Sequence, residues 1–166
     1  PLVYEFKRVK AIAYGDEKLF VVGGCEISDT APAFVIAEIG NNHNGDIERA
    51  KEMTRLAVEA GADCVKFQMR NMASLYKNNQ SPASAADLGA EYTLDLLSRF
   101  QLTNDELFEV FDYCKELGVP PLCTPWDESS LTALETYGMD FYKVASADLT
   151  NHPLLDALCA TGKPLI

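Results

Sequence analysis

From residue 34 onward, short apolar runs alternate with amphipathic stretches that end at a glycine, and few folds accommodate this pattern. The apolar runs predict strands over residues 34–39, 64–69, 121–124 and 141–146. The amphipathic stretches predict helices over residues 47–60, 91–99, 103–117, 127–137 and 153–160. Near-continuous apolar strands separated by helices are typical of a parallel sheet covered by helices, so we expect an α/β fold.

Two parallel architectures fit this alternation, a TIM barrel and an open doubly wound sheet. No G-x-G-x-x-G follows the first expected strand and no P-loop is present, which weakens the nucleotide-binding open sheet. The barrel is therefore favoured. Four and a fraction strand–helix units make about half of the eight that a TIM (β/α)8 barrel needs, so residues 31–166 predict the N-terminal half of one.

The ends of the chain differ from this pattern. Residues 1–30 predict a β-hairpin extension in front of the barrel, with strands at residues 6–13 and 18–23 around a turn at 14–17, placed to plug the barrel floor. At the other end, residues 162–166 predict a helix stop and the start of a strand. With no initiator Met, the chain is expected to be a fragment of a longer protein. The polar residues 71–89 predict a loop with a function or some mobility.

Charge and composition exclude several classes of partner. The chain has 14 Lys and Arg against 25 Asp and Glu, a formal net charge of −11, and would repel both a nucleic-acid backbone and an anionic membrane surface. No apolar run approaches the roughly 20 residues that cross a bilayer, and the start has no signal-peptide pattern, so we expect a cytoplasmic protein. Five scattered cysteines without a Cys-x-x-Cys pair predict reduced thiols.

Polar side chains stand late in each expected strand, where a parallel α/β protein collects its reactive groups. By the period of two, Glu38 shares a face with the apolar residues of the first strand, and Lys66 and Gln68 share a face of the second. Thr124 ends the third strand. Lys143 lies in the fourth, within a span from residue 83 to the end that has four cations and fourteen acids.

Two lysines, an acid, an amide and hydroxyls at strand ends predict a pocket for an anionic ligand, a carboxylate or a phosphate. The alternative is a buried ion pair between Glu38 and Lys66 that holds neighbouring strands together. Ser146 is three residues from Lys143 and must lie past the strand end to join the same site. His43 and His152 have no second ligand at metal-binding spacing, so no metal site is assigned to these residues.

Five stretches, in order and spacing, resemble the sialic acid synthase (N-acetylneuraminate synthase) family across about residues 34–166. They are Ile36–Gly45 (IAEIGNNHNG), Ala60–Gln68 (AGADCVKFQ), Cys123–Asp127 (CTPWD), Tyr142–Ser146 (YKVAS) and Thr150–Leu155 (TNHPLL). The resemblance implies a TIM barrel with the active site at the carboxyl ends of its strands. It also implies a C–C bond-forming transferase of carbohydrate biosynthesis, which condenses phosphoenolpyruvate with an N-acetylated amino sugar such as N-acetylmannosamine and releases phosphate.

Carried over by position, the resemblance assigns roles to the strand-end residues. Four of them would hold the phosphate and carboxylate of phosphoenolpyruvate, namely Lys66, Thr124, Lys143 and Ser146. Glu38 and Gln68 would lie at the reacting centre and the sugar. Asp148 stands where the family usually has a glutamate, so a shorter side chain would extend toward the sugar.

The family also implies parts that these residues do not supply. A divalent metal, manganese or magnesium, would polarise the aldehyde of the open-chain sugar, and its histidine ligands would lie beyond Ile166. A C-terminal domain would cover the sugar across a homodimer. The 166 residues alone are therefore expected to be inactive. Two other readings stay open: another phosphoenolpyruvate-condensing barrel that makes a deoxy-sugar acid, and a non-catalytic half-barrel that binds a partner.

Overall fold

The computed structural model describes residues 20–28, 30–75 and 95–166. Its main sheet has three parallel strands, β3 (Ile36–Gly40), β4 (Cys64–Met69) and β5 (Pro121–Pro125), side by side in that order. Tyr142 continues the sheet beyond β5 through a parallel bridge to Cys123, and a second parallel bridge joins Tyr142 to Leu165. Neighbours in the sheet thus follow the order of the chain, and the predicted parallel α/β fold is confirmed.

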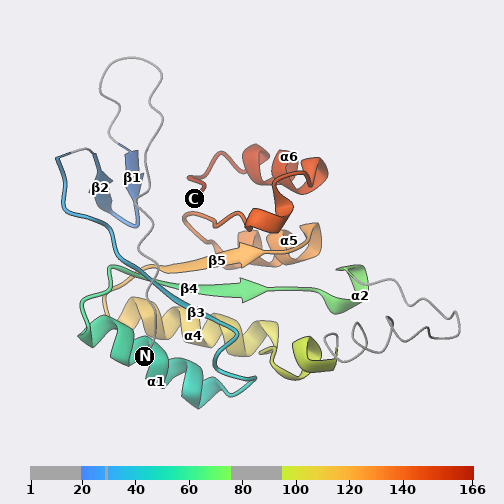
Figure 1. The fold of residues 1–166 in the computed structure, drawn as a ribbon, viewed down its shortest axis with the longest axis horizontal. Coiled ribbons are helices and arrows are strands. Elements are labelled where there is room, and N and C mark those ends of the chain that lie inside the picture. The colour runs from blue at the N-terminus through green and yellow to red at the C-terminus, as the bar shows by residue number, and fades with distance from the viewer. Residues whose placement is uncertain (1–19, 29, 76–94) are drawn as a thin grey trace, which may run out of the picture.

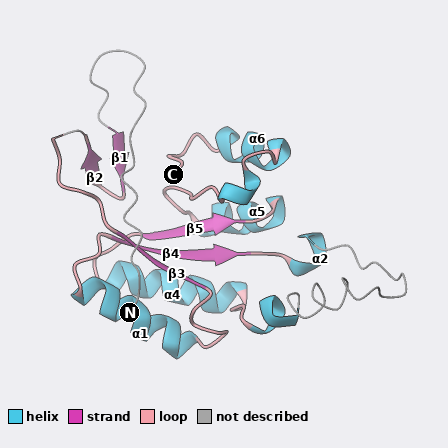
Figure 2. Ribbon diagram, viewed as in Figure 1, coloured by secondary structure: helices cyan, strands magenta, loops and turns pink. Residues whose placement is uncertain are grey.

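Helices connect the successive strands. The chain forms α1 (Ile47–Glu59) between β3 and β4, and α2 (Met72–Leu75) and α4 (Asn104–Glu116) between β4 and β5. It then forms α5 (Glu128–Tyr137) and α6 (His152–Ala160). Figure 1 shows α1 and α4 along one face of the sheet, and Figure 2 shows the same view by type of element. The helix expected over residues 91–99 is described only from residue 95, and residues 95–99 are helical.

Local capping signals explain where these helices begin. Asp46 accepts a hydrogen bond from the backbone N–H of Arg49 at the start of α1. Thr103 and Glu106 form a reciprocal capping box at the start of α4, as the sequence predicts. The later helices α5 and α6 also lie within a residue or so of their expected bounds.

The fourth expected strand is shorter than residues 141–146. Sheet pairing covers residues 142–144, where the backbone N–H of Lys143 donates to Cys123 at 3.1 Å and that of Val144 donates to Ile166 at 2.8 Å. The chain then turns into a 3-10 helix, η1 (Ser146–Asp148), because the N–H of Asp148 donates to the nearby carbonyl of Ala145. This local turn replaces sheet hydrogen bonds, so the strand prediction was wrong at its carboxyl end.

Two apolar clusters lie on opposite faces of the sheet. The larger fills the space between sheet and helices, with Phe67, Phe111 and Tyr142 among its fully buried side chains. The smaller lies on the other face, which we call the inner face, near the amino ends of the strands. Its buried members are Val22, Cys64, Leu122 and Phe141.

A β-hairpin supplies Val22 to that inner cluster. It consists of β1 (Phe20–Val22) and β2 (Cys25–Ile27), antiparallel strands with Val22 opposite Cys25. The hairpin expected from the sequence paired residues 18–23 with residues 6–13, and the latter lie outside the described residues. Within the described part, residues 20–22 pair with the segment that follows, because Gly23 and Gly24 adopt the positive φ angles of a tight turn.

Candidate functional site

The inner face carries an ion pair between its first two strands. Glu38 and Lys66 are register partners in β3 and β4, and Lys66 Nζ lies 3.0 Å from Glu38 Oε1. The Lys66 side chain is only 7% exposed, whereas that of Glu38 is 57% exposed. A buried ammonium requires a compensating anion, and this one has a carboxylate that still faces solvent. The pair therefore joins a buried positive charge to a carboxylate that solvent can still reach.

Thr124 stands beside this pair on the next strand. It is the register partner of Gln68 and lies on the same face as the inner-cluster residue Leu122, two positions earlier in β5. The residue is 1% exposed, and its Oγ1 is buried without a hydrogen-bond partner among the described residues. Buried hydroxyls are almost always hydrogen-bonded, so this one has hydrogen-bonding capacity that the described residues leave unused.

Gln68 extends the same row toward the carboxyl end of β4. Its Oε1 accepts a hydrogen bond from Arg70 Nη2 at 2.5 Å. Gly40, with a φ of +54°, lies between the ends of Glu38 and Gln68: a Cβ at this position would be 3.0 Å from Glu38 Oε1 and 3.3 Å from Gln68 Nε2. The positive φ favours glycine here, and a side chain would also press on the ends of these two polar groups.

The remaining predicted site residues lie on the segment after β5. Lys143 is half-buried, follows the helix-facing Tyr142 and donates from Nζ to the carbonyl of Val144 at 2.5 Å. Ser146 is exposed at the start of η1, past the sheet, as the spacing required. Asp148 is 8% exposed; its Oδ1 accepts from Asn151 at 3.1 Å, while its Oδ2 is buried without a partner among the described residues.

The structure thus brings Glu38, Lys66, Gln68 and Thr124 together on one face of adjacent strands. Lys143 lies on the next segment of the sheet, and Ser146 and Asp148 lie in the turn that follows it. The sequence argument did not single out Arg70 as a site residue, although its spacing of two from Gln68 places it on the same face. Arg70 also contacts an aromatic ring, since its Cζ lies 4.2 Å from the centroid of the Trp126 ring.

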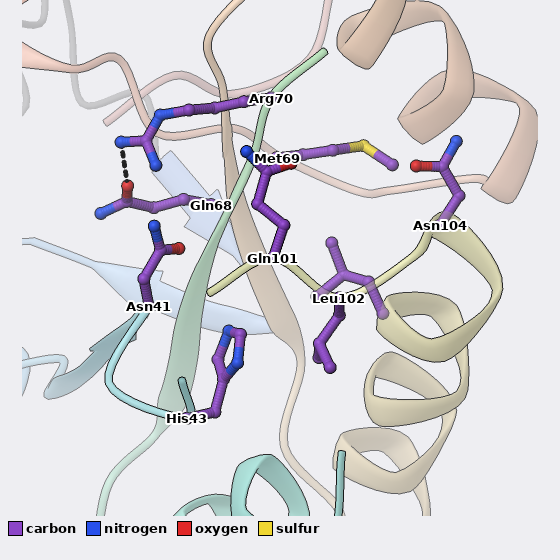
Figure 3. A pocket seen from close by; sticks show the side chains of 9 residues that line it. Asn41, His43, Gln68, Met69, Arg70, Gln101, Leu102 and Asn104 are labelled. Carbon is purple, nitrogen blue, oxygen red and sulfur yellow. Dashed lines mark hydrogen bonds between the residues drawn. The ribbon is translucent and has the colours of Figure 1, made fainter. Parts of the chain in front are cut away.

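A cavity opens beside this row, between the carboxyl end of β4 and the start of α4 (Figure 3). Its lining is mainly polar and consists of Asn41, His43, Gln68, Met69, Arg70, Gln101, Leu102, Asn104 and Leu107. His43 is 2% exposed and accepts the N–H of Gly45 at Nδ1, so it organises the turn before α1 rather than facing solvent. Burial lowers the pKa of His43, which leaves the imidazole neutral at neutral pH.

Neither a metal ligand set nor a thiol nucleophile stands out in this site. Across residues 20–28, 30–75 and 95–166, no group of three or more His, Cys, Asp and Glu side chains could hold a metal ion. The described residues thus offer no such ligand group, and we derive no step through a metal. Burial raises the pKa of Cys123, so this thiol stays protonated and unreactive at neutral pH. No helix among the described residues has the length and apolar character to cross a membrane.

The fold and site define a parallel α/β protein with a buried lysine and an unpartnered buried hydroxyl on one face of adjacent strands. Residues 53–166 match the NeuB family, and the chain belongs to that family. It is 32% identical over 137 residues to N-acetylneuraminate-9-phosphate synthase of Mus musculus, an alignment that covers 81% of this chain and 38% of the relative. It is also 32% identical over 142 residues to N,N'-diacetyllegionaminic acid synthase of Legionella pneumophila, covering 80% and 38%.

Among solved structures, the N-acetylneuraminic acid (sialic acid) synthetase of Leptospira borgpetersenii superposes with a TM-score of 0.77 at 26% identity. The superposition covers 89% of this chain and 48% of that one. The chain thus spans about two fifths of the length of these curated relatives and about half of the solved one. The α/β fold is therefore similar to that of a sialic acid synthase.

Proposed function

We propose that this chain forms the N-terminal half of a TIM barrel. Sheet neighbours that follow chain order, without the reversal that a doubly wound sheet contains, support a barrel wall. The helices α1 and α4 pack on one face, and the opposite face carries the polar row. In a barrel these become the outside and the lumen, with the carboxyl ends of the strands as the active-site rim.

We further propose that the protein to which the chain belongs condenses phosphoenolpyruvate with an N-acetylated amino sugar, giving a sialic or related nonulosonic acid. The observation that carries this proposal is the buried Lys66 beside the orphan Thr124 hydroxyl. An ammonium and a hydroxyl donor, both desolvated, suit an oxyanion of phosphate or carboxylate. Lys143 and Ser146 supply further donors on the adjacent segment.

The methylene carbon of phosphoenolpyruvate forms a C–C bond to the aldehyde carbon of the open-chain sugar, whose oxygen takes up a proton and becomes a hydroxyl. Water adds to the resulting cationic carbon and gives up a proton. The C–O bond to the phosphate then breaks as the ketone forms, and inorganic phosphate leaves. Lys66 and Thr124 hold the anion in place, while Glu38 and Gln68 lie at the reacting centre and Asp148 offers its unpartnered Oδ2 to a sugar hydroxyl. A divalent metal, manganese or magnesium, is proposed to be held by residues outside those described. A cytoplasmic homodimer is part of the same proposal.

The test is phosphate release by the full-length protein that contains this chain. It would be incubated with phosphoenolpyruvate, manganese and a panel of N-acetylated hexosamines, with arabinose and erythrose phosphates alongside. Lys66→Ala should lose roughly a hundredfold or more in kcat/KM, because one preorganised donor to an oxyanion has about that effect. Lys51→Ala removes a surface lysine that pairs with Glu109 and should leave the rate unchanged.

Each alternative result of this assay supports a different function. Turnover only with an arabinose or erythrose phosphate would identify a deoxy-sugar acid synthase. No phosphate release with any sugar would leave the Glu38–Lys66 pair as a tie between strands and favour a non-catalytic role. The 166-residue chain alone is proposed to be inactive because it carries only part of the active site. Turnover by this chain with manganese would overturn that proposal.

A further inference from the structure

We infer that Arg70, held against Trp126, is a positioning residue that fixes the orientation of the Gln68 amide toward the reacting centre. The inference rests on the proposed function and adds to it a residue that acts through Gln68 rather than by contacting the substrate itself. Its basis is the geometry at the carboxyl ends of β4 and β5, where Arg70, Gln68 and Trp126 form a connected group.

The first step is chemical. An amide side chain has one accepting and one donating end, and an arginine side chain can only donate. Because Arg70 Nη2 lies 2.5 Å from Gln68 Oε1, the amide oxygen must face Arg70 and the amide nitrogen must face away from it. Figure 3 shows Arg70 and Gln68 on the same side of β4, joined by this hydrogen bond, with Met69 on the other side.

The second step concerns what the amide nitrogen then faces. A Cβ at Gly40 would lie 3.3 Å from Gln68 Nε2 and 3.0 Å from Glu38 Oε1, so the amide nitrogen is the Gln68 atom turned toward Gly40 and the side of the Glu38 carboxylate. A flipped amide would turn its oxygen toward that carboxylate instead, and two acceptors repel one another. Arg70 therefore makes Gln68 an N–H donor at the position where an oxygen of the amino sugar would bind.

The third step is how Arg70 itself is held. The guanidinium lies over the Trp126 ring, with Cζ 4.2 Å from the ring centroid, within the range of a cation–π contact. The ring is placed by the backbone, since the N–H of Trp126 donates to the carbonyl of Met69 at 3.0 Å and continues the β4–β5 pairing past the end of the strands. Sheet pairing thus fixes the position of Trp126, the Trp126 ring holds the guanidinium of Arg70, and Arg70 fixes the orientation of the Gln68 amide.

A double-mutant cycle in the full-length protein tests this chain of contacts. Arg70→Met keeps a long side chain against Trp126 but loses the donor, and should lower kcat/KM for the amino sugar roughly tenfold to a hundredfold. The KM for phosphoenolpyruvate should not change. In a Gln68→Ala background, Arg70→Met should have less than about a twofold further effect, because Arg70 acts through the missing amide. Arg70→Lys, which keeps a donor, should recover part of the loss.

The matched control is Arg55→Met, which removes a surface arginine paired with Glu52 and Glu59 on α1 and should leave both kinetic constants unchanged. Additive losses in the Arg70 and Gln68 cycle would mean that Arg70 contacts substrate itself, and would overturn the inference. An equal rise in both KM values would do the same, because it would indicate general damage to the site.

Two spectroscopic readouts on the 166-residue chain decide the geometry without turnover. Trp126 is the only tryptophan, so its emission reports the arginine contact directly and should shift in Arg70→Met. The Gln68 side-chain amide signals, assigned by their loss in Gln68→Ala, should also shift. Unchanged emission and amide signals in Arg70→Met would overturn the inference. Shifted signals in the 166-residue chain, together with a full-length protein that uses none of the sugars, would retain the positioning contact and reject only the proposed function.

Discussion

Two kinds of charged side chain occur in this chain, and only one kind is informative about function. Arg55 on α1 pairs with Glu52 and Glu59 in contacts that are exposed and common on helices, and that contribute little to stability. Lys66 is almost fully buried against a carboxylate that remains half exposed. Burial of one partner alone is costly for a simple structural tie, which is why the Lys66 environment favours a ligand anion.

Asp127 combines a structural role with a titration that can be measured. Its carboxylate accepts hydrogen bonds from the backbone N–H groups of Asn71 (2.7 Å) and Ser130 (2.8 Å) and from the hydroxyls of Ser129 and Ser130. Burial works to raise the Asp127 pKa, but these donors outweigh it and lower the pKa below the ordinary value for Asp. The ionised form therefore joins the end of β4 to the start of α5.

The lowered pKa predicts how stability depends on pH. A group with a depressed folded-state pKa stabilises the fold fully above its ordinary value, about 4, and loses this contribution as pH falls through the folded value. Asp127→Ala should therefore reduce the free energy of unfolding at pH 7 by about 1 kcal/mol, with a smaller difference at pH 3. Urea unfolding at both pH values measures this. Asp127→Asn keeps a capping acceptor without the titration, so its stability should vary less with acid. A difference between wild type and Asp127→Ala that grows toward pH 3 would contradict the prediction.

At the scale of elements, the helices were predictable because their signals are local. Thr103 and Glu106 at a spacing of three specify a capping box, and both of its hydrogen bonds are present. Gly138 ends α5 in the left-handed region, with a φ of +91°. Each signal involves residues within one turn of each other, so no knowledge of the rest of the fold is needed to interpret it.

Other parts of the structure depend on contacts that the sequence does not display. The period of two predicted that Lys66 and Gln68 share a face of one strand and that Glu38 shares a face with the apolar residues of another. It did not predict that Trp126 would stack on Arg70, because that contact requires the β4–β5 register. The early end of the fourth strand depends on the competition between sheet bonds and the η1 turn, which an apolar run does not reveal. Half of the predicted hairpin lies outside the described residues.

The capping box of α4 gives a prediction at this scale. Thr103→Ala removes the side-chain acceptor for the N–H of Glu106 and the hydroxyl that donates to the Glu106 carboxylate, and should destabilise the chain by about 1 kcal/mol. Thr136→Ala is the matched control, because Thr136 is exposed within α5 and alanine has the higher helix propensity. It should be neutral or slightly stabilising. Thermal or urea unfolding of the three proteins measures both effects, and equal stability of wild type and Thr103→Ala would contradict the first.

At the scale of the whole molecule, the sheet is open on both sides within the described residues. Its order runs from β3 through β4 and β5 to Tyr142 and Leu165, so β3 has one strand neighbour and Leu165 forms the opposite border. The hairpin covers the inner face through Val22 but does not pair with β3 in the sheet. Backbone groups on an open strand edge are a template for another chain.

This openness predicts that the isolated 166-residue chain self-associates. Size-exclusion chromatography with light scattering should give a mass above the 18.3 kDa of one chain, rising with protein concentration. Added salt should strengthen association, because it screens the repulsion between chains that each carry a net charge of −11. In the full-length protein the same edges would be paired within a closed barrel, so its mass should stay constant over the same range. A stable monomer of the short chain at all concentrations would show that its edges are covered, and would contradict the half-barrel. If the short chain associates and the full-length protein keeps one mass, barrel closure is what removes the exposed edges and completes the site around Lys66.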